Sequence, residues 1–169
     1  MKKQILKALG GVSLAILMLA AFAQVWVSAE NKGNESLQND NEQGLVGSWN
    51  VQVTIRDCQT GAALVSFPAM LTFNQGGTMQ ETANDAAPLS RLPGHGVWSH
   101  QRGRRYSAAF QFFRFNPDGT FAGRNVIRST ASLGQSGDEY TTTDTVGVFD
   151  ANGNLLVTAC ATSAATRFE

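Results

Sequence analysis

Residues 104–133 read RRYSAAFQFFRFNPDGTFAGRNVIRSTASL, and this stretch decides the fold class. At its centre, Asn116-Pro117-Asp118-Gly119 combines a proline, which presets φ, with a glycine, which accepts the left-handed conformation of a tight turn. Apolar and polar residues alternate on both sides of the turn, a period typical of half-buried β-strands. The stretch therefore predicts an antiparallel hairpin with strands at 104–115 and 120–133.

The same alternation continues on both sides of this hairpin, and no helical periodicity follows residue 45. Six further strands are expected, at 49–56, 63–74, 78–83, 95–101, 139–149 and 154–168, with a long loop over 84–94. Pro68 lacks the N–H that a β-ladder needs, so we expect a bulge or an unpaired edge at its position. Eight sequential strands with short connections predict an all-β fold, an eight-stranded antiparallel up-and-down barrel, because closure removes exposed sheet edges.

Pairing counted from the turn at 116–119 assigns side chains to the two faces of the sheet. It places Phe115 opposite Thr120 and Phe112 opposite Gly123. The more apolar face, which we expect to line the interior, carries Tyr106, Ala108, Phe110, Phe112, Arg114, Phe121, Gly123, Asn125, Ile127, Ser129, Tyr140, Thr142, Asp144, Val146, Val148, Leu155, Val157, Ala159, Ala161 and Ser163.

The composition fits one turn-rich β domain: of 169 residues, 17 are glycine and 15% are charged. Basic and acidic residues are equal at 13 each, and three of the lysines lie within the first seven positions. Nucleic-acid-binding proteins carry a clustered basic face, which this balance does not supply. We therefore expect no nucleic-acid partner.

The first 29 residues have the parts of a secretory signal peptide. Three lysines begin it, and residues 12–23 form an apolar run that is shorter than the ~20 residues of a membrane span. Val27-Ser28-Ala29 offers small residues for cleavage before Glu30, and Ala21-Phe22-Ala23 is a second candidate. An uncleaved anchor is the alternative interpretation.

Three regions follow from this assignment. Residues 1–29 are the signal peptide, residues 30–44 are a polar, flexible leader, and residues 45–169 are the barrel domain. The protein is expected to be exported to the periplasm or the extracellular space, with no membrane attachment after cleavage.

Gly47-Ser48-Trp49 opens the first expected strand, and Arg167 lies near the end of the last. In these residues the sequence resembles the lipocalin-type (calycin) barrels, which begin with a Gly-x-Trp motif. The resemblance implies that Arg167 packs over Trp49 as a cation–π pair that closes the base of the barrel.

The chain has two cysteines, Cys58 and Cys160, and cysteines of an exported chain are usually paired. Antiparallel partners have residue numbers with a constant sum, and the pair Cys58 and Cys160 lies one diagonal step from the pair Trp49 and Arg167. We therefore predict a disulfide that joins the first strand to the last. Two free buried thiols are the alternative.

A polar group is expected inside the barrel. The predicted pairing sets Tyr106, Ser129 and Asp144 opposite one another, with Asn125 and Arg114 further along the same face. Three interpretations stay open: a structural hydrogen-bond network or one bound water, a polar patch that orients a small ligand, or acid–base chemistry with Asp144 as the base. The predicted ligand-binding residues are Tyr106, Phe110, Phe112, Arg114, Asn125, Ser129 and Asp144.

Binding of a small hydrophobic or amphipathic molecule is the favoured function, because many predicted interior residues are small and leave room for a ligand. A barrel enzyme resembling allene oxide cyclase or dirigent proteins is the alternative, and no catalytic residues are assigned. An envelope interaction module is a third hypothesis, with a homodimer formed through the outward Phe113 and Phe115.

No metal ion and no cofactor are expected. His95 and His100 are the only histidines, and their five-residue spacing on one strand directs them to opposite faces.

Overall fold

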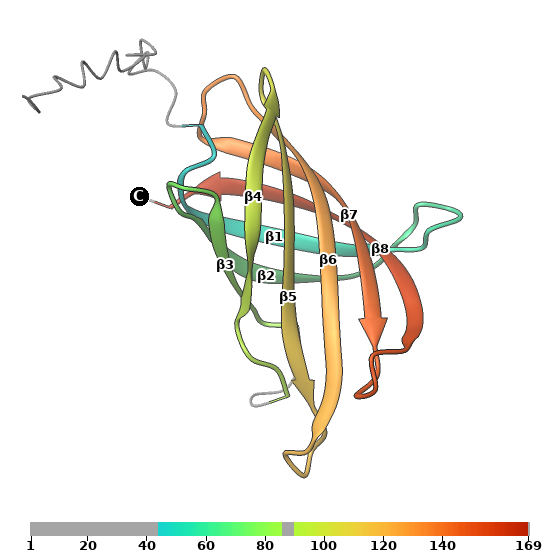
Figure 1. The fold of residues 1–169 in the computed structure, drawn as a ribbon. Coiled ribbons are helices and arrows are strands. Elements are labelled where there is room, and N and C mark those ends of the chain that lie inside the picture. The colour runs from blue at the N-terminus through green and yellow to red at the C-terminus, as the bar shows by residue number, and fades with distance from the viewer. Residues whose placement is uncertain (1–43, 86–89, 169) are drawn as a thin grey trace, which may run out of the picture. The chain divides into compact units, whose positions relative to one another are not determined.

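The computed structural model describes residues 44–85 and 90–168, which form one closed β-barrel (Figure 1). Its strands are β1 (Gly47–Arg56), β2 (Ala63–Phe73), β3 (Thr78–Ala83), β4 (Gly94–Arg102), β5 (Arg105–Phe115), β6 (Phe121–Leu133), β7 (Glu139–Phe149) and β8 (Leu155–Arg167). Each strand pairs antiparallel with the next, and β8 pairs with β1. The prediction of an all-β, eight-stranded antiparallel up-and-down barrel is confirmed.

The expected signal peptide at 1–29 and the leader up to residue 43 lie outside the described residues. Within the described ranges, the structure has no helix that is long and apolar enough to cross a membrane.

The predicted strand limits agree with the observed ones to within two residues because the turns are encoded locally. In the β5–β6 turn, the N–H of Gly119 donates to the carbonyl of Asn116 at 2.9 Å. The Asp118 carboxylate accepts both the N–H and the hydroxyl of Thr120. Asp150 plays the same part in the β7–β8 turn, where its carboxylate accepts two backbone N–H groups.

Aromatic side chains pack together at one end of the barrel. The ring centroids of Trp49 and Tyr140 lie 4.8 Å apart, and those of Phe73 and Trp98 lie 5.9 Å apart, both edge to face. Phe73 also meets Tyr140, and Trp98 meets Tyr106. We call these five residues the aromatic base. Since large rings close this end, open space inside the barrel lies beyond them.

The first and last strands meet along a regular seam. The register runs from Trp49 opposite Arg167 to Arg56 opposite Cys160. Just past the end of β1, Cys58 forms a disulfide with Cys160, with a Cα–Cα distance of 5.2 Å. The seam is therefore held by a β-ladder along its length and by a covalent bond at one end.

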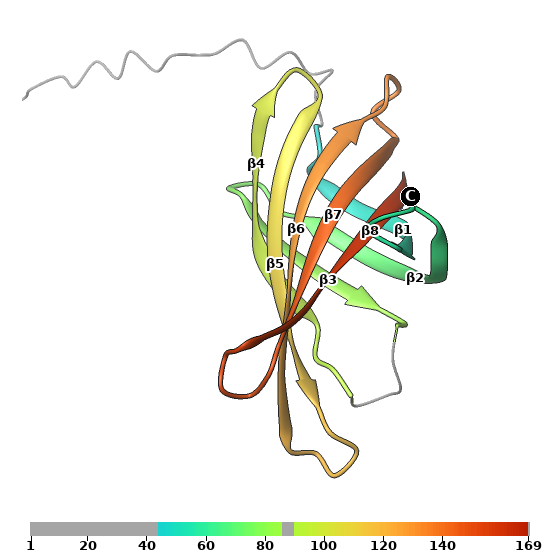
Figure 2. The same ribbon diagram turned by 90° about the vertical axis from the view of Figure 1, so that its right-hand side faces the viewer.

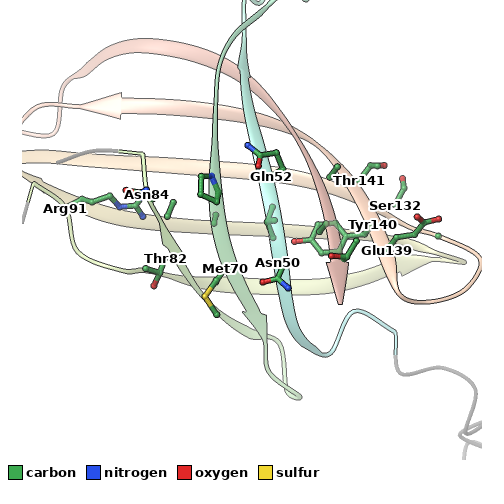
Figure 3. A pocket seen from close by; sticks show the side chains of 18 residues that line it. Asn50, Gln52, Met70, Thr82, Asn84, Arg91, Ser132, Glu139, Tyr140 and Thr141 are labelled. Carbon is green, nitrogen blue, oxygen red and sulfur yellow. The ribbon is translucent and has the colours of Figure 1, made fainter. Parts of the chain in front are cut away.

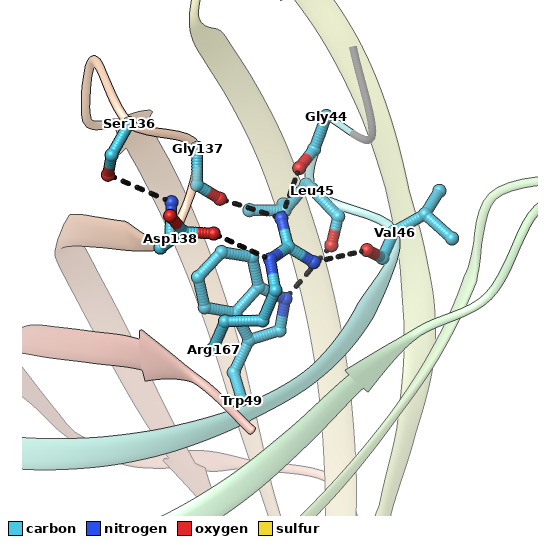
Figure 4. Close-up of polar contacts among 8 residues, drawn as sticks. All are labelled: Gly44, Leu45, Val46, Trp49, Ser136, Gly137, Asp138 and Arg167. Carbon is cyan, nitrogen blue, oxygen red and sulfur yellow. Dashed lines mark hydrogen bonds and ion pairs between the residues drawn. The ribbon is translucent and has the colours of Figure 1, made fainter. Parts of the chain in front are cut away.

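Arg167 closes the other end of the seam (Figure 4). Its guanidinium carbon lies 4.2 Å from the centroid of the Trp49 ring. The guanidinium donates to the carbonyls of Gly44, Val46 and Gly137 at 2.7–3.1 Å. The arrangement matches what the Gly-x-Trp resemblance implies for Trp49 and Arg167.

The glycine of that motif is required by the same contact. Gly47 has φ +124°, and a Cβ added there would lie 2.8 Å from Nη1 of Arg167. Any side chain at Gly47 would therefore be strained and would displace the guanidinium from Trp49.

Between Arg105 and Arg114 of β5, the β5–β6 register differs from the predicted one by two residues, and at Phe115 it differs by one. Phe112 lies opposite Asn125 and not Gly123, and Phe115 lies opposite Phe121 and not Thr120. The register shifts between Arg114 and Phe115, across from Gly123, whose φ is +126°. Counting from the turn could not include this bulge. Because the error is an even number of residues, it left most side chains on the predicted face.

Three residues predicted to face inward are exposed: Phe121 (45%), Leu155 (56%) and Val157 (53%). They lie near the tips of the β5–β6 and β7–β8 hairpins, which extend past the neighbouring strands (Figures 1 and 2). β8 pairs with β1 only from Cys160 onward, so this part of β8 has no opposite wall to pack against. Alternation alone does not show where a strand outruns its neighbours.

Pro68 has no bulge, but it does lie at an edge. It pairs with Gln52 of β1, and the β1–β2 register shifts only between Ile55 and Arg56. The last β2–β3 pair is Ala69 with Ala83, so Pro68 lies just beyond the end of this ladder. The missing N–H therefore leaves the paired part of the sheet intact.

Candidate functional site

The barrel interior beyond the aromatic base holds a cavity of about 100 Å³. Its apolar lining is formed by Val53, Ile55, Phe67, Leu71, Phe110, Phe112, Ile127, Val146 and Ala161. Its polar lining is formed by Glu81, Asp85, Arg91, Asn125, Ser129, Tyr140, Thr142, Asp144 and Ser163. An apolar cavity of about 150 Å³ accommodates benzene, so this cavity has room for a ligand of a few non-hydrogen atoms.

Five of the seven predicted ligand-binding residues line this cavity: Phe110, Phe112, Asn125, Ser129 and Asp144. Ser129 and Asp144 lie directly opposite each other on β6 and β7, as expected. The other two, Tyr106 and Arg114, do not line it.

Tyr106 is not brought together with Ser129 and Asp144. It lies opposite Ala131, in the aromatic base, with its ring 5.9 Å from Trp98 and 5.1 Å from His100. Arg114 lies towards the hairpin tip, where Nη2 donates to the carbonyl of Phe149 at 3.0 Å. The displacement of Tyr106 follows from the two-residue register error on β5, whereas Arg114 lies opposite Gly123, near the hairpin tip and outside the cavity lining.

Asp144 is the central polar residue of the cavity. It is 6% exposed, and its Oδ2 accepts hydrogen bonds from the hydroxyls of Thr142 at 2.7 Å and Ser163 at 3.3 Å. Its Oδ1 is buried and meets no described group at hydrogen-bond geometry, although the hydroxyl of Ser129, directly opposite on β6, also stabilises this carboxyl. Burial raises the pKa of this carboxyl above its usual value, while hydrogen bonding by neighbouring hydroxyls opposes the rise.

Asp144 is expected to make stability depend on pH. Because its pKa is higher in the folded state than the usual value of 3.8, the folded state binds the proton more tightly. The free energy of unfolding should therefore fall as the pH rises from about 4 to 7, and Asp144→Asn should flatten this dependence. Urea unfolding across this range measures both curves.

The comparison isolates Asp144 because Glu81, whose pKa burial also raises, is unchanged in the variant. The Asp57, Asp118 and Asp150 carboxyls have lowered pKa values and titrate below this range. Identical pH dependence in the two proteins would contradict the prediction.

Tyr140, and not Tyr106, is the tyrosine that lines the cavity together with Asp144. It is 2% exposed, and its hydroxyl has no hydrogen-bond partner among the described residues. Burial raises the pKa of Tyr140, and the negative charge of Asp144 raises it further. Sequence reasoning placed both tyrosines inward but selected Tyr106. The four-residue spacing of Tyr140 and Asp144 on one strand was the signal that could have identified the right one.

Arg91 closes one side of the cavity. Its guanidinium carbon lies 3.5 Å from the centroid of the Phe112 ring, and it forms ion pairs with Glu81 and Asp85. Glu81 is 4% exposed, and burial raises its pKa although the charge of Arg91 opposes the rise. Sequence reasoning missed these residues because the 84–94 loop has no periodicity from which a contact could be inferred.

A larger open groove of about 970 Å³ is lined by residues of β1–β3 and β6–β8 (Figure 3). Its side chains include the exposed Asn50, Gln52, Met70 and Thr141. Binding sites enclose most of their ligand, and the interior cavity is more enclosed than this groove and presents the buried, unpartnered atoms of Asn125 and Asp144, which the groove lacks. We therefore place the candidate site inside the barrel.

Within residues 44–85 and 90–168, no group of three His, Cys, Asp or Glu side chains could hold a metal ion. His95 is exposed, and Nε2 of His100 lies 2.7 Å from the carbonyl of Gly103.

Phe113 and Phe115 lie on the outside of β5. Phe113 is 44% exposed, whereas Phe115 is half-buried. Both rings meet Phe121, at centroid distances of 5.7 and 6.3 Å. Pairing of two copies through Phe113 and Phe115 stays a prediction.

Comparisons of the chain with protein families, with curated proteins and with solved structures found no matching family model, no similar protein and no similar structure.

Proposed function

We propose that this protein binds a small amphipathic molecule inside its barrel. One observation carries the proposal: three buried polar atoms that border an otherwise largely apolar cavity have no hydrogen-bond partner among the described residues. They are Oδ1 of Asn125, the hydroxyl of Tyr140 and Oδ1 of Asp144. A bound molecule with a polar head and a short apolar body would satisfy such a lining.

The energetic reason is the cost of leaving polar groups unpaired. A buried group without a partner destabilises the folded state by about 1–3 kcal/mol. Native proteins keep few such groups, and each one calls for a partner or a functional role. A polar head that contacts one of these atoms would recover part of this free energy as binding affinity.

The size of the cavity limits the ligand. Pockets for drug-sized ligands usually enclose about 300–1,000 Å³, and this cavity encloses about 100 Å³. An apolar cavity of about 150 Å³ accommodates benzene. The proposed ligand is therefore of the size of a short-chain alcohol or amine.

We also propose that the protein is an exported, lipocalin-like barrel. The packing of Arg167 over Trp49 and the steric need for Gly47 support the resemblance. The Cys58–Cys160 disulfide is compatible with an oxidising compartment and so supports export. The acid–base interpretation began from a predicted pairing that set Tyr106, Ser129 and Asp144 opposite one another. Tyr106 instead lies opposite Ala131, so we do not propose the cyclase-like alternative.

Binding of butan-1-ol, followed by amide chemical shifts, tests the interior site. We expect saturable shifts at cavity residues such as Ser129 and Ala161. Ala161→Leu, which fills the cavity from a residue that is 4% exposed, should abolish them. Ala164→Leu on the same strand is the matched control, because Ala164 is exposed and lines the outer groove.

The expected result is that only the interior substitution removes binding. Loss of binding in Ala164→Leu alone would move the site to the outer groove and contradict the proposal. Absence of saturable shifts with butan-1-ol, n-butylammonium and butyrate would also contradict it.

A further inference from the structure

The charges that face the cavity do not balance. The ionisable side chains that line it are Glu81, Asp85, Arg91, Tyr140 and Asp144. Among these described residues Arg91 is the single cation, and its guanidinium is already paired with Glu81 and Asp85. Asp144 therefore has no cationic partner in the lining, and the site as a whole carries an excess of acidic groups.

The free hydrogen-bonding capacity of the site is that of an acceptor. Oδ1 of Asp144 and Oδ1 of Asn125 can only accept, and the Tyr140 hydroxyl can accept as well as donate. Thr142 and Ser163 direct their hydroxyls at Oδ2 of Asp144, and the hydroxyl of Ser129 opposite it also stabilises the charged carboxyl. No described group meets Oδ1 at hydrogen-bond geometry, which leaves this atom for a further donor.

The surroundings of Asp144 favour an apolar substituent beside that donor. Phe110, Ile127, Val146 and Ala161 line the same cavity. Asp144 lies between the two other unpartnered groups along the barrel. On β7, Tyr140 is four residues away from it. On β6, Asn125 is four residues from Ser129, the residue opposite Asp144. A donor at Asp144 would thus be held midway along the cavity, with apolar wall around it.

We infer that the interior site takes a small primary amine in its ammonium form, with an ammonium N–H donated to Oδ1 of Asp144 and a short apolar chain against the cavity wall. The inference rests on the proposed function and names its ligand class. Two observations support the inference. Asp144 is only 6% exposed and has no cationic partner in the cavity lining, and its Oδ1 meets no described group at hydrogen-bond geometry.

The competing ligand classes satisfy the site less well. An alcohol offers Asp144 a single donor and no charge, so the buried carboxylate stays uncompensated. A carboxylate ligand brings a second negative charge next to Asp144 and offers no donor. Charge-assisted hydrogen bonds are about twice as strong as neutral ones, and we expect about tenfold to hundredfold tighter binding of the amine than of the alcohol.

Three probes with the same four-carbon chain test the inference: n-butylammonium, butan-1-ol and butyrate. Each is titrated into the full chain, produced with its disulfide, at about pH 8, where an alkylammonium is still charged. The readouts are the dissociation constant and the location of the amide shifts. We expect n-butylammonium to bind most tightly, with shifts at interior residues, and butyrate to bind least.

Asp144→Asn should weaken n-butylammonium binding by about tenfold to hundredfold and so remove its preference over butan-1-ol, with both probes titrated into the same variant. Glu139→Gln is the matched control, since Glu139 lies on the same strand, is exposed and undergoes the same change from carboxylate to amide. This control should keep the full preference.

The outcomes separate the inference from the proposed function. If butan-1-ol binds inside the barrel as tightly as n-butylammonium, the inference is overturned and the proposed function stands. If none of the three probes binds, both fail. If the preference for the amine survives Asp144→Asn, or is lost equally in Glu139→Gln, it reflects the general charge of the protein and the inference is overturned.

Discussion

Removal of the Cys58–Cys160 disulfide is expected to lower the free energy of unfolding by about 4 kcal/mol. The bond joins residues that are 102 positions apart, so it withdraws a large amount of conformational freedom from the unfolded chain. It also fixes the connection after β1 to β8 at the point where the β1–β8 ladder ends. The disulfide therefore constrains a long segment of the unfolded chain, the one between Cys58 and Cys160.

Urea unfolding with and without a reductant measures this effect. The Cys58→Ala/Cys160→Ala double variant should unfold at the same midpoint as the reduced wild-type protein, and reductant should leave that midpoint unchanged. Intact mass under non-reducing conditions establishes the bond itself. Two alkylatable thiols, or a wild-type midpoint that reductant does not shift, would contradict the prediction.

Trp49→Ala is expected to cost about 3–5 kcal/mol of stability. The Trp49 side chain is fully buried, and its Nε1–H donates to the carbonyl of Leu45 at 3.0 Å. Its ring also supports Tyr140 on one side and the guanidinium of Arg167 on another. Truncation would leave a cavity in the aromatic base and remove the surface on which Arg167 rests.

Trp49→Phe separates these contributions. Phenylalanine retains most of the buried ring but cannot donate to Leu45, so we expect a smaller loss of about 1–2 kcal/mol. Thermal or urea unfolding monitored by far-ultraviolet circular dichroism does not depend on the removed fluorophore. A Trp49→Ala variant within about 1 kcal/mol of the wild type would show that the base does not need this ring.

The fold could be predicted from the sequence because its signals are local. Asn116–Gly119 and Asp150–Gly153 define their turns with side chains that hydrogen-bond the turn itself. The alternation of apolar and polar residues between the turns then assigns side chains to the two faces of the sheet. A sheet of eight sequential antiparallel strands has few ways to close into a barrel. The bulge across from Gly123 depends on a close approach to the carbonyl of Phe149 on another strand, which no local pattern contains.

The candidate site could be predicted only in part. Phe112, Ser129 and Asp144 were identified from the face they share, which an even-numbered register error does not change. Choosing between Tyr106 and Tyr140 required the register itself. Arg91 reaches the cavity from a loop, and its position depends on a buried partner, Glu81, that is ten residues away in sequence.

The seam between β1 and β8 has a consequence for the continuity of the chain. A protease that cuts one peptide bond between Cys58 and Cys160 would produce two fragments that remain joined by the disulfide and by the strands beside it. The N–H of Phe168 donates to the carbonyl of Ser48, so the two ends of the barrel domain lie within one hydrogen bond of each other. A short linker across this gap would allow new termini to be opened at the exposed β5–β6 turn, which makes the domain a natural candidate for circular permutation.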